Sequence, residues 1–238
     1  MITLHSVSKS LGKGRSRRRV LDDINWSVQP RQQYVILGQQ GAGKSTLLNI
    51  MIGTHLPNSG WVERKGAICP GRTLIRLGGP DTTTRQLSKQ LAQLYNVPYV
   101  ELIDFLPRFA HLEKSLDAPI RSLPKSIQQR LSYALIYAIP FDVYLFDGDI
   151  GPRNTAFNEA CRQAFDQRCK AASMIVATSR PNIARKFEAV GGVLHEGKIH
   201  FFETIEEAIS VFGRLPHPKN RSEFFDAEPE DDDLEDWI

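Results

Sequence analysis

The sequence has few of the features that mark secreted or membrane-spanning proteins. Only three of its 238 residues are cysteine, and Cys69, Cys161 and Cys169 are too scattered for a disulfide framework or a zinc site. The first residues lack the architecture of a signal peptide. The longest apolar run, residues 133–141, is far short of the roughly 20 residues that span a bilayer. We therefore expect a reduced, cytoplasmic compartment and a protein that is soluble or held at a membrane by a partner.

Basic residues are missing from the C-terminal segment. Residues 223–238 hold nine acidic side chains and no lysine or arginine, so the other residues carry 30 basic against 18 acidic side chains, a net +12. We expect residues 216–238 to be an acidic, solvated and disordered tail, with self-shielding or docking onto a basic partner as further roles.

A basic run at residues 13–19 lies between two strand-like segments and is typical of a hairpin tip. It is either a solvated loop or a contact for anionic lipid or a partner. No aromatic residue interleaves with these charges to stack on bases, so we do not expect nucleic acid as a partner.

Apolar periodicity predicts alternating strands and helices. Strands are predicted at residues 2–8, 20–28, 33–37, 143–147, 174–178 and 191–195. Helices are predicted at residues 44–52, 85–95, 99–112, 127–138 and 155–172. This alternation favours an α/β fold with a mainly parallel sheet flanked by helices.

A glycine-rich turn joins the predicted strand at 33–37 to the helix that follows. Its residues match G-x-x-x-x-G-K-[ST]: Gly38, Gln39, Gln40, Gly41, Ala42, Gly43, Lys44 and Ser45. Backbone N–H groups of such a loop converge on phosphates, and the helix N-terminus adds a favourable dipole. Together with Thr46, these residues predict an ATP site, in which Lys44 reaches the β- and γ-phosphates and Ser45 binds Mg²⁺.

The apolar strand at residues 143–146 runs into Asp147. In P-loop proteins an aspartate at this position holds magnesium, so Asp147 and Ser45 are the predicted metal ligands. A second carboxylate that activates water is expected next, but the following residue is Gly148. Asp149 is the remaining candidate for a catalytic base, although the chain is leaving the strand there.

The loop at residues 38–48 resembles that of ABC-transporter ATPase subunits. Three further blocks, at residues 53–62, 128–134 and 192–199, agree with that family. Within it, the short chain, Cys69-Pro70-Gly71 and residues 206–209 are similar to subunits that power capsular-polysaccharide export. The resemblance implies a P-loop ABC fold over residues 1–215, with an N-terminal antiparallel β part and a helical subdomain at about 76–135. It also implies a cytoplasmic-face location at the inner membrane, a membrane permease partner, and a homodimer or a heterodimer with another ABC ATPase.

Several motifs depart from the family pattern. The L-S-G-G-Q signature falls on Leu123, Pro124, Lys125, Ser126 and Ile127, where only the leucine agrees. Ser126 and Gln129 have the spacing of a capping box, so a helix is still expected to start there. The Q-loop glutamine, the adenine-stacking aromatic and the switch histidine are missing; the last two positions fall on Leu11 and Ser179.

These departures predict ATP binding with impaired hydrolysis. Gly148 replaces the carboxylate expected after Asp147, and the signature is altered in the same chain. No dimer of this chain would therefore have a complete site. Two alternatives to an ATP-binding subunit for polysaccharide export stay open at this point. One is a non-hydrolysing, nucleotide-dependent regulatory partner of a consensus ATPase. The other is a soluble P-loop protein outside transport.

Overall fold

The N-terminal part of the chain forms an antiparallel sheet. The computed structural model describes residues 1–238 except 13, 80, 113–115, 153–155 and 217–238. Strands β1 (Ile2–Leu11), β2 (Arg18–Ser27) and β4 (Ser59–Arg64) pair in the order β2-β1-β4. The 3-10 turn η1 (Gly14–Ser16) joins β1 to β2, which confirms the hairpin predicted around the basic run.

A second sheet of five strands carries the centre of the fold. Its order is β5-β6-β3-β7-β8, and all neighbouring pairs are parallel except β7 with β8. The strands are β3 (Gln33–Leu37), β5 (Val143–Asp147), β6 (Ser173–Thr178), β7 (Val190–His195) and β8 (Lys198–Phe202). The predicted parallel sheet is confirmed, and β8 is an added antiparallel edge.

Alternation along the central strands divides the core into two layers. On β5, Val143 and Leu145 face one cluster, which also contains residues of helix α1 (Lys44–Ile52) and of the antiparallel sheet. Tyr144 and Phe146 face the other cluster, which contains residues of helices α5 (Ala156–Cys169) and α7 (Ile205–Arg214). Successive side chains of a strand point to opposite faces. Because both faces are covered, these strands are continuously apolar.

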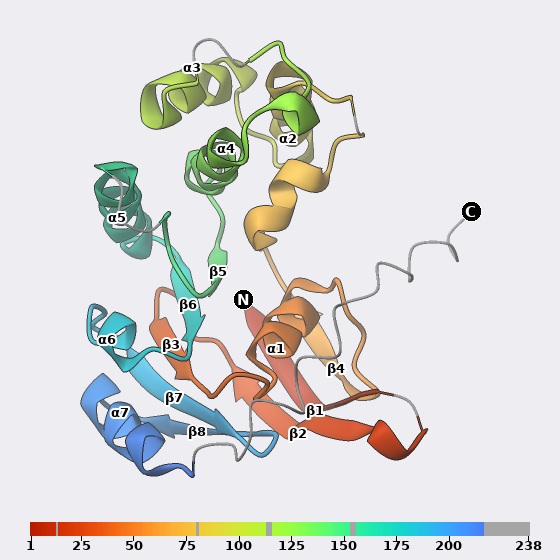
Figure 1. The fold of residues 1–238 in the computed structure, drawn as a ribbon, viewed down its shortest axis with the longest axis vertical. Coiled ribbons are helices and arrows are strands. Elements are labelled where there is room, and N and C mark those ends of the chain that lie inside the picture. Colours follow the sequence, from red (N-terminus) through yellow and green to blue (C-terminus); the bar gives the residue numbers. More distant parts are fainter. Residues whose placement is uncertain (13, 80, 113–115, 153–155, 217–238) are drawn as a thin grey trace.

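The remaining helices gather in a second lobe (Figure 1). This lobe contains α2 (Thr84–Leu94), α3 (Tyr99–Ala110), α4 (Lys125–Ala138) and the short η3 (Ile120–Ser122). The 3-10 turn η2 (Gly71–Arg76) connects it to the sheet, and α6 (Pro181–Ala184) lies beside α7 at the far end of the molecule. The domain bounds inferred from the sequence stay a prediction.

The predicted capping box of Ser126 and Gln129 is wrong. Helix α4 begins at Lys125, two residues earlier than predicted, and its N-cap is Pro124, with no side-chain cap hydrogen bond. The proline φ of −51° suits the entry into a helix, and the Gln128 amide donates to the Leu123 carbonyl at 2.8 Å. A capping box is present instead at α2, where Thr83 and Gln86 bond each other's backbone.

All three cysteines are buried and free. Burial raises the pKa of each thiol, Cys69, Cys161 and Cys169, to about 12. The prediction that they form no disulfide is confirmed.

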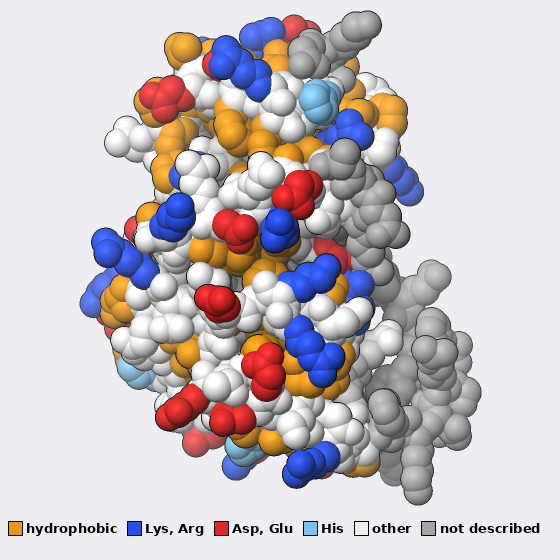
Figure 2. Space-filling model, turned by 90° about the vertical axis from the view of Figure 1, so that its left-hand side faces the viewer, with side chains coloured by type: hydrophobic (Ala, Val, Ile, Leu, Met, Phe, Trp, Pro, Cys, Tyr) orange, Lys and Arg blue, Asp and Glu red, His pale blue; other side chains and the backbone are white. Residues whose placement is uncertain are grey.

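The surface carries interspersed charges. Figure 2 shows lysine and arginine side chains among aspartate and glutamate, with hydrophobic side chains visible between them across the middle of the face. Within the described part of the chain, every helix is too short or too polar to cross a bilayer.

Candidate functional site

The glycine-rich loop joins β3 to α1 and has a backbone that requires glycine. Gly41 and Gly43 have φ of +77° and +100°, in the left-handed region that other residues rarely adopt. A Cβ at Gly43 would also lie 2.7 Å from the Val20 carbonyl oxygen of β2. The loop therefore lies close against the antiparallel sheet, and side chains larger than hydrogen do not fit at Gly43.

Lys44 is the first residue of α1, and its side chain turns back over the loop. Its Nζ donates to the carbonyl oxygens of Gly38 at 2.8 Å and Gln39 at 2.9 Å. Burial lowers the pKa of Lys44 below its ordinary value, while the negative charge of Asp147 acts in the opposite direction. Phosphate oxygens near this ammonium would favour its charged form, so the site gains from binding an anion.

Ser45 and Asp147 are exposed and lie on elements that pack together. Ser45 is in the first turn of α1, and Asp147 ends β5. The two elements share one core cluster through Leu47, Leu48 and Leu145. A hydroxyl and a carboxylate oxygen are ligands that Mg²⁺ prefers in proteins. These two residues would hold the ion, which supplies charge neutralisation for the β- and γ-phosphates when bound.

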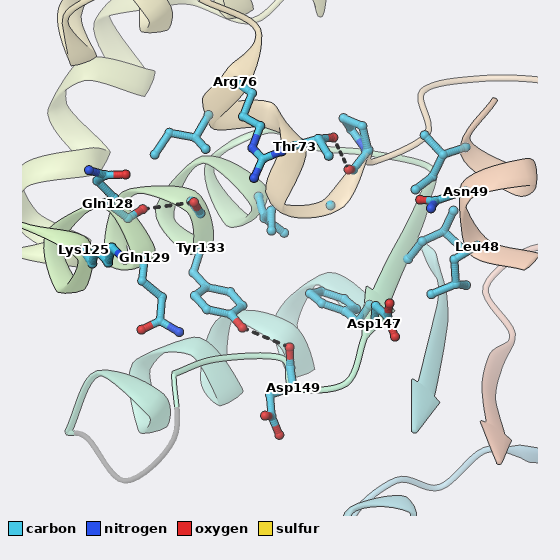
Figure 3. Close-up of a pocket in the computed structure, with 18 of the residues that line it drawn as sticks. Leu48, Asn49, Thr73, Arg76, Lys125, Gln128, Gln129, Tyr133, Asp147 and Asp149 are labelled. Atoms are coloured by element: carbon cyan, nitrogen blue, oxygen red, sulfur yellow. Dashed lines mark hydrogen bonds between the residues drawn. The ribbon is translucent and has the colours of Figure 1, made fainter. Parts of the chain in front are cut away.

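After Asp147 the chain turns sharply. Gly148 has a φ of +94°, so the strand alternation that would place Asp149 on the face of Asp147 ends there. In Figure 3 the two carboxylates point away from each other. The Asp149 backbone carbonyl accepts a hydrogen bond of 3.2 Å from the Tyr133 hydroxyl of α4.

Asp149 forms an ion pair with Arg180. The distance between Arg180 Nη2 and Asp149 Oδ1 is 2.7 Å, and the two side chains are 33% and 22% exposed. Arg180 lies just beyond the exposed Ser179, the position where the resemblance places a switch histidine. Sequence reasoning missed Arg180, and the only available signal was a cation directly after that position.

A cavity of about 740 Å³ separates the two lobes beside Asp147. Its wall is formed by α1, η2, α4 and β5, and both basic and acidic side chains line it (Figure 3). The charged residues among those that line it are Arg76, Lys125, Asp147 and Asp149. Lys125 and Ser126, which stand at the signature positions, are exposed at the start of α4. The altered signature residues Pro124, Lys125 and Ser126 are thus on the surface, on a different lobe from the glycine-rich loop.

The fold and the loop define a P-loop NTPase with an antiparallel β part and a helical lobe. A family model described as "ABC transporter" matches residues 21–148, more than half of the chain. The chain belongs to the ABC transporter family, and it is an ATP-binding subunit of that family.

Curated relatives match nearly the whole chain. "ATP-binding protein BexA" of Haemophilus influenzae is 28% identical over 212 residues, which cover 89% of this chain and 98% of the relative. "Capsule polysaccharide export ATP-binding protein CtrD" of Neisseria meningitidis is 27% identical, over 91% of this chain and 100% of the relative. "Polysialic acid transport ATP-binding protein KpsT" of Escherichia coli is 29% identical, over 89% and 96%.

A solved structure has the same fold. It is titled "Dimeric structure of a post-hydrolysis state of the ATP-binding cassette MJ0796 bound to ADP and Pi". Its TM-score is 0.70 at 21% identity, and the match covers 86% of this chain and 99% of that one.

Proposed function

We propose that the chain powers export of capsular or another cell-surface polysaccharide, at the cytoplasmic face of the inner membrane. The observation that supports this is the nearly full-length similarity to relatives named for capsule polysaccharide and polysialic acid export. In this proposal the chain works with a membrane permease and as a dimer; membership of the family supports both, and the dimeric cassette of like fold is consistent with the dimer.

ATP binds at residues 38–46 in this proposal, and Ser45 and Asp147 hold Mg²⁺. Lys44 leaves the two loop carbonyls and contacts the phosphates. Chemistry at the terminal phosphate is slow, because Gly148 offers no carboxylate and Asp149 is engaged by Arg180. Loss of a general base typically lowers rate about 10²–10⁴-fold.

The test compares ATP binding with phosphate release for the wild type, Lys44→Ala and Asp149→Asn. We expect the wild type to bind ATP and to release phosphate slowly, and Lys44→Ala to lose both. An Asp149→Asn protein as active as the wild type would exclude Asp149 as a base. A wild type that binds no ATP in the presence of Mg²⁺ would contradict the proposal.

The transport half needs a cellular test. A strain that lacks the gene should lose its surface polysaccharide and regain it with the wild-type gene but not with Lys44→Ala. Normal surface polysaccharide in the deletion strain would exclude this export role.

A second candidate function is a nucleotide-dependent regulatory partner that does not hydrolyse ATP. The ion pair of Asp149 with Arg180 favours it, because the carboxylate of the candidate base already binds a guanidinium and is not free to accept a proton from water. Tight ATP binding with no phosphate release above the Lys44→Ala control, alone or beside a consensus ATPase, would support this function over the first.

A further inference from the structure

An arginine–carboxylate pair connects the loops that follow two neighbouring strands of the central sheet. Asp149 comes after β5 and Arg180 after β6, and their side chains meet at 2.7 Å. Both side chains keep part of their surface in water. The pair is therefore accessible to a competing anion.

The backbone places this pair beside the glycine-rich loop. Thr178, the last residue of β6, accepts a hydrogen bond at 3.2 Å from the Gly38 N–H, where that loop begins. On the other side, the Gly148 N–H donates to the Ala177 carbonyl at 2.8 Å. The Arg180 N–H donates to the Thr178 hydroxyl at 3.2 Å, which fixes the start of its loop. One strand end thus contacts both the phosphate-binding loop and the turn that carries Asp149.

Arginine suits an exchange between two anions. Its guanidinium stays charged, and its planar donors match carboxylate and phosphate groups equally well. The terminal phosphate of a nucleoside triphosphate carries more negative charge than one carboxylate. It would therefore compete with Asp149 for the same donors.

We propose that the Arg180 guanidinium leaves Asp149 and binds the terminal phosphate of the nucleotide when a triphosphate binds. This rests on the proposed ATP binding at residues 38–46. Asp149 is then a positioning residue that holds Arg180 in the empty and diphosphate-bound states. The pair makes the site distinguish ATP from ADP without a histidine at position 179.

The experiment measures the affinities for ATP and ADP, each with Mg²⁺, by calorimetry. Arg180→Ala should lower the affinity for ATP about tenfold, the change that 1.4 kcal/mol produces. It should leave the affinity for ADP nearly unchanged. Arg180→Lys, which keeps the charge but not the planar donors, should fall between the two.

Asp149→Asn tests the exchange from the other side. An amide no longer holds the guanidinium by charge, so this variant should bind ATP more tightly relative to ADP than the wild type does. The matched control is Arg185→Ala, which removes an exposed arginine from the same segment. It should leave the ratio of the two affinities unchanged, and thermal unfolding checks that each variant is folded.

The outcomes separate this inference from the function on which it rests. Equal loss of ATP and ADP affinity in Arg180→Ala, or no loss of either, would overturn the exchange while ATP binding stands. A wild type that binds neither nucleotide would overturn both.

Discussion

Gly148 stands where the family resemblance calls for a glutamate, and its backbone matters as much as its missing side chain. Its φ of +94° lies in the left-handed region, and a Cβ built there would have nothing within 4 Å. The cost of a larger residue is therefore one of backbone conformation and not of a clash. A glutamate at this position would have to accept that conformation or straighten the turn that carries Asp149.

Gly148→Ala should lower the free energy of unfolding by about 1 kcal/mol, because alanine is strained at this φ. The matched control is Gly213→Ala in α7, where a Cβ also meets nothing within 4 Å and φ is not positive. There, alanine should raise the free energy of unfolding by roughly 0.5 kcal/mol, since it favours the helix. Denaturant unfolding of both variants measures the difference, and equal effects would contradict the argument.

The parts of the site that the sequence predicts are those that lie together in the chain. Residues 38–46 form one strand–loop–helix segment, so their spacing alone indicates a phosphate-binding loop. Asp149 and Arg180 are 31 positions apart. Their contact depends on the pairing of β5 with β6 and on the turn at Gly148, which no local pattern reveals.

Helix α4 joins the altered signature to the segment after Asp147. Its N-terminus carries Lys125 and Ser126, and two of its tyrosines reach the loop after β5. The Tyr133 hydroxyl donates to the Asp149 carbonyl, and the Tyr137 hydroxyl donates to the Ile150 carbonyl at 2.6 Å. A shift of the helical lobe would therefore displace Asp149 directly.

Tyr137→Phe should lower the free energy of unfolding by about 1–3 kcal/mol, because the Ile150 carbonyl loses its donor in a region where Tyr137 is only 1% exposed. Tyr95→Phe is the control. It makes the same chemical change in the same lobe and keeps the ring, which packs edge-on against Phe141. Calorimetric unfolding should show a smaller loss for the control. No loss in Tyr137→Phe would mean that α4 does not hold this loop.

Strands and helices could be predicted where burial gives the sequence a regular spacing of apolar residues. The central strands were found because both faces are covered, and α2 and α4 because apolar residues recur along one helical face. The start of α4 was misplaced because the S-x-x-Q spacing favoured Ser126 as the N-cap, whereas Pro124, with a φ of −51°, takes that position. The Thr83 and Gln86 pair had the same kind of signal and is the capping box that forms.

The whole molecule combines a basic body with an acidic C-terminal segment. Gln39 of the glycine-rich loop donates to the Pro216 carbonyl at 2.9 Å, so residue 216 lies against the predicted nucleotide site. The nine acidic side chains at residues 223–238 are tethered to this point. Like charges repel over about a Debye length, roughly 8 Å at physiological salt, so we expect this acidic segment to weaken the binding of an anionic nucleotide.

A chain that ends at Pro216 should bind ATP more tightly than the full chain at low salt. The gain should be no more than about 1 kcal/mol, the upper range for exposed charges, and should shrink as salt is added. A full-length variant with the acidic residues of this segment changed to amides is the control and should behave like the shortened chain. Equal affinities at low salt for all three proteins would show that the segment does not act on the site by charge.

The three buried thiols have a practical consequence for labelling. A thiol with a pKa near 12 is almost entirely protonated at neutral pH, and only the thiolate reacts with alkylating reagents. We therefore expect the native cysteines to react slowly with alkylating reagents, so that the chain gives a low background for site-directed probes. A single cysteine introduced at an exposed position such as Leu56 would take up a fluorophore, without any need to replace the native cysteines first.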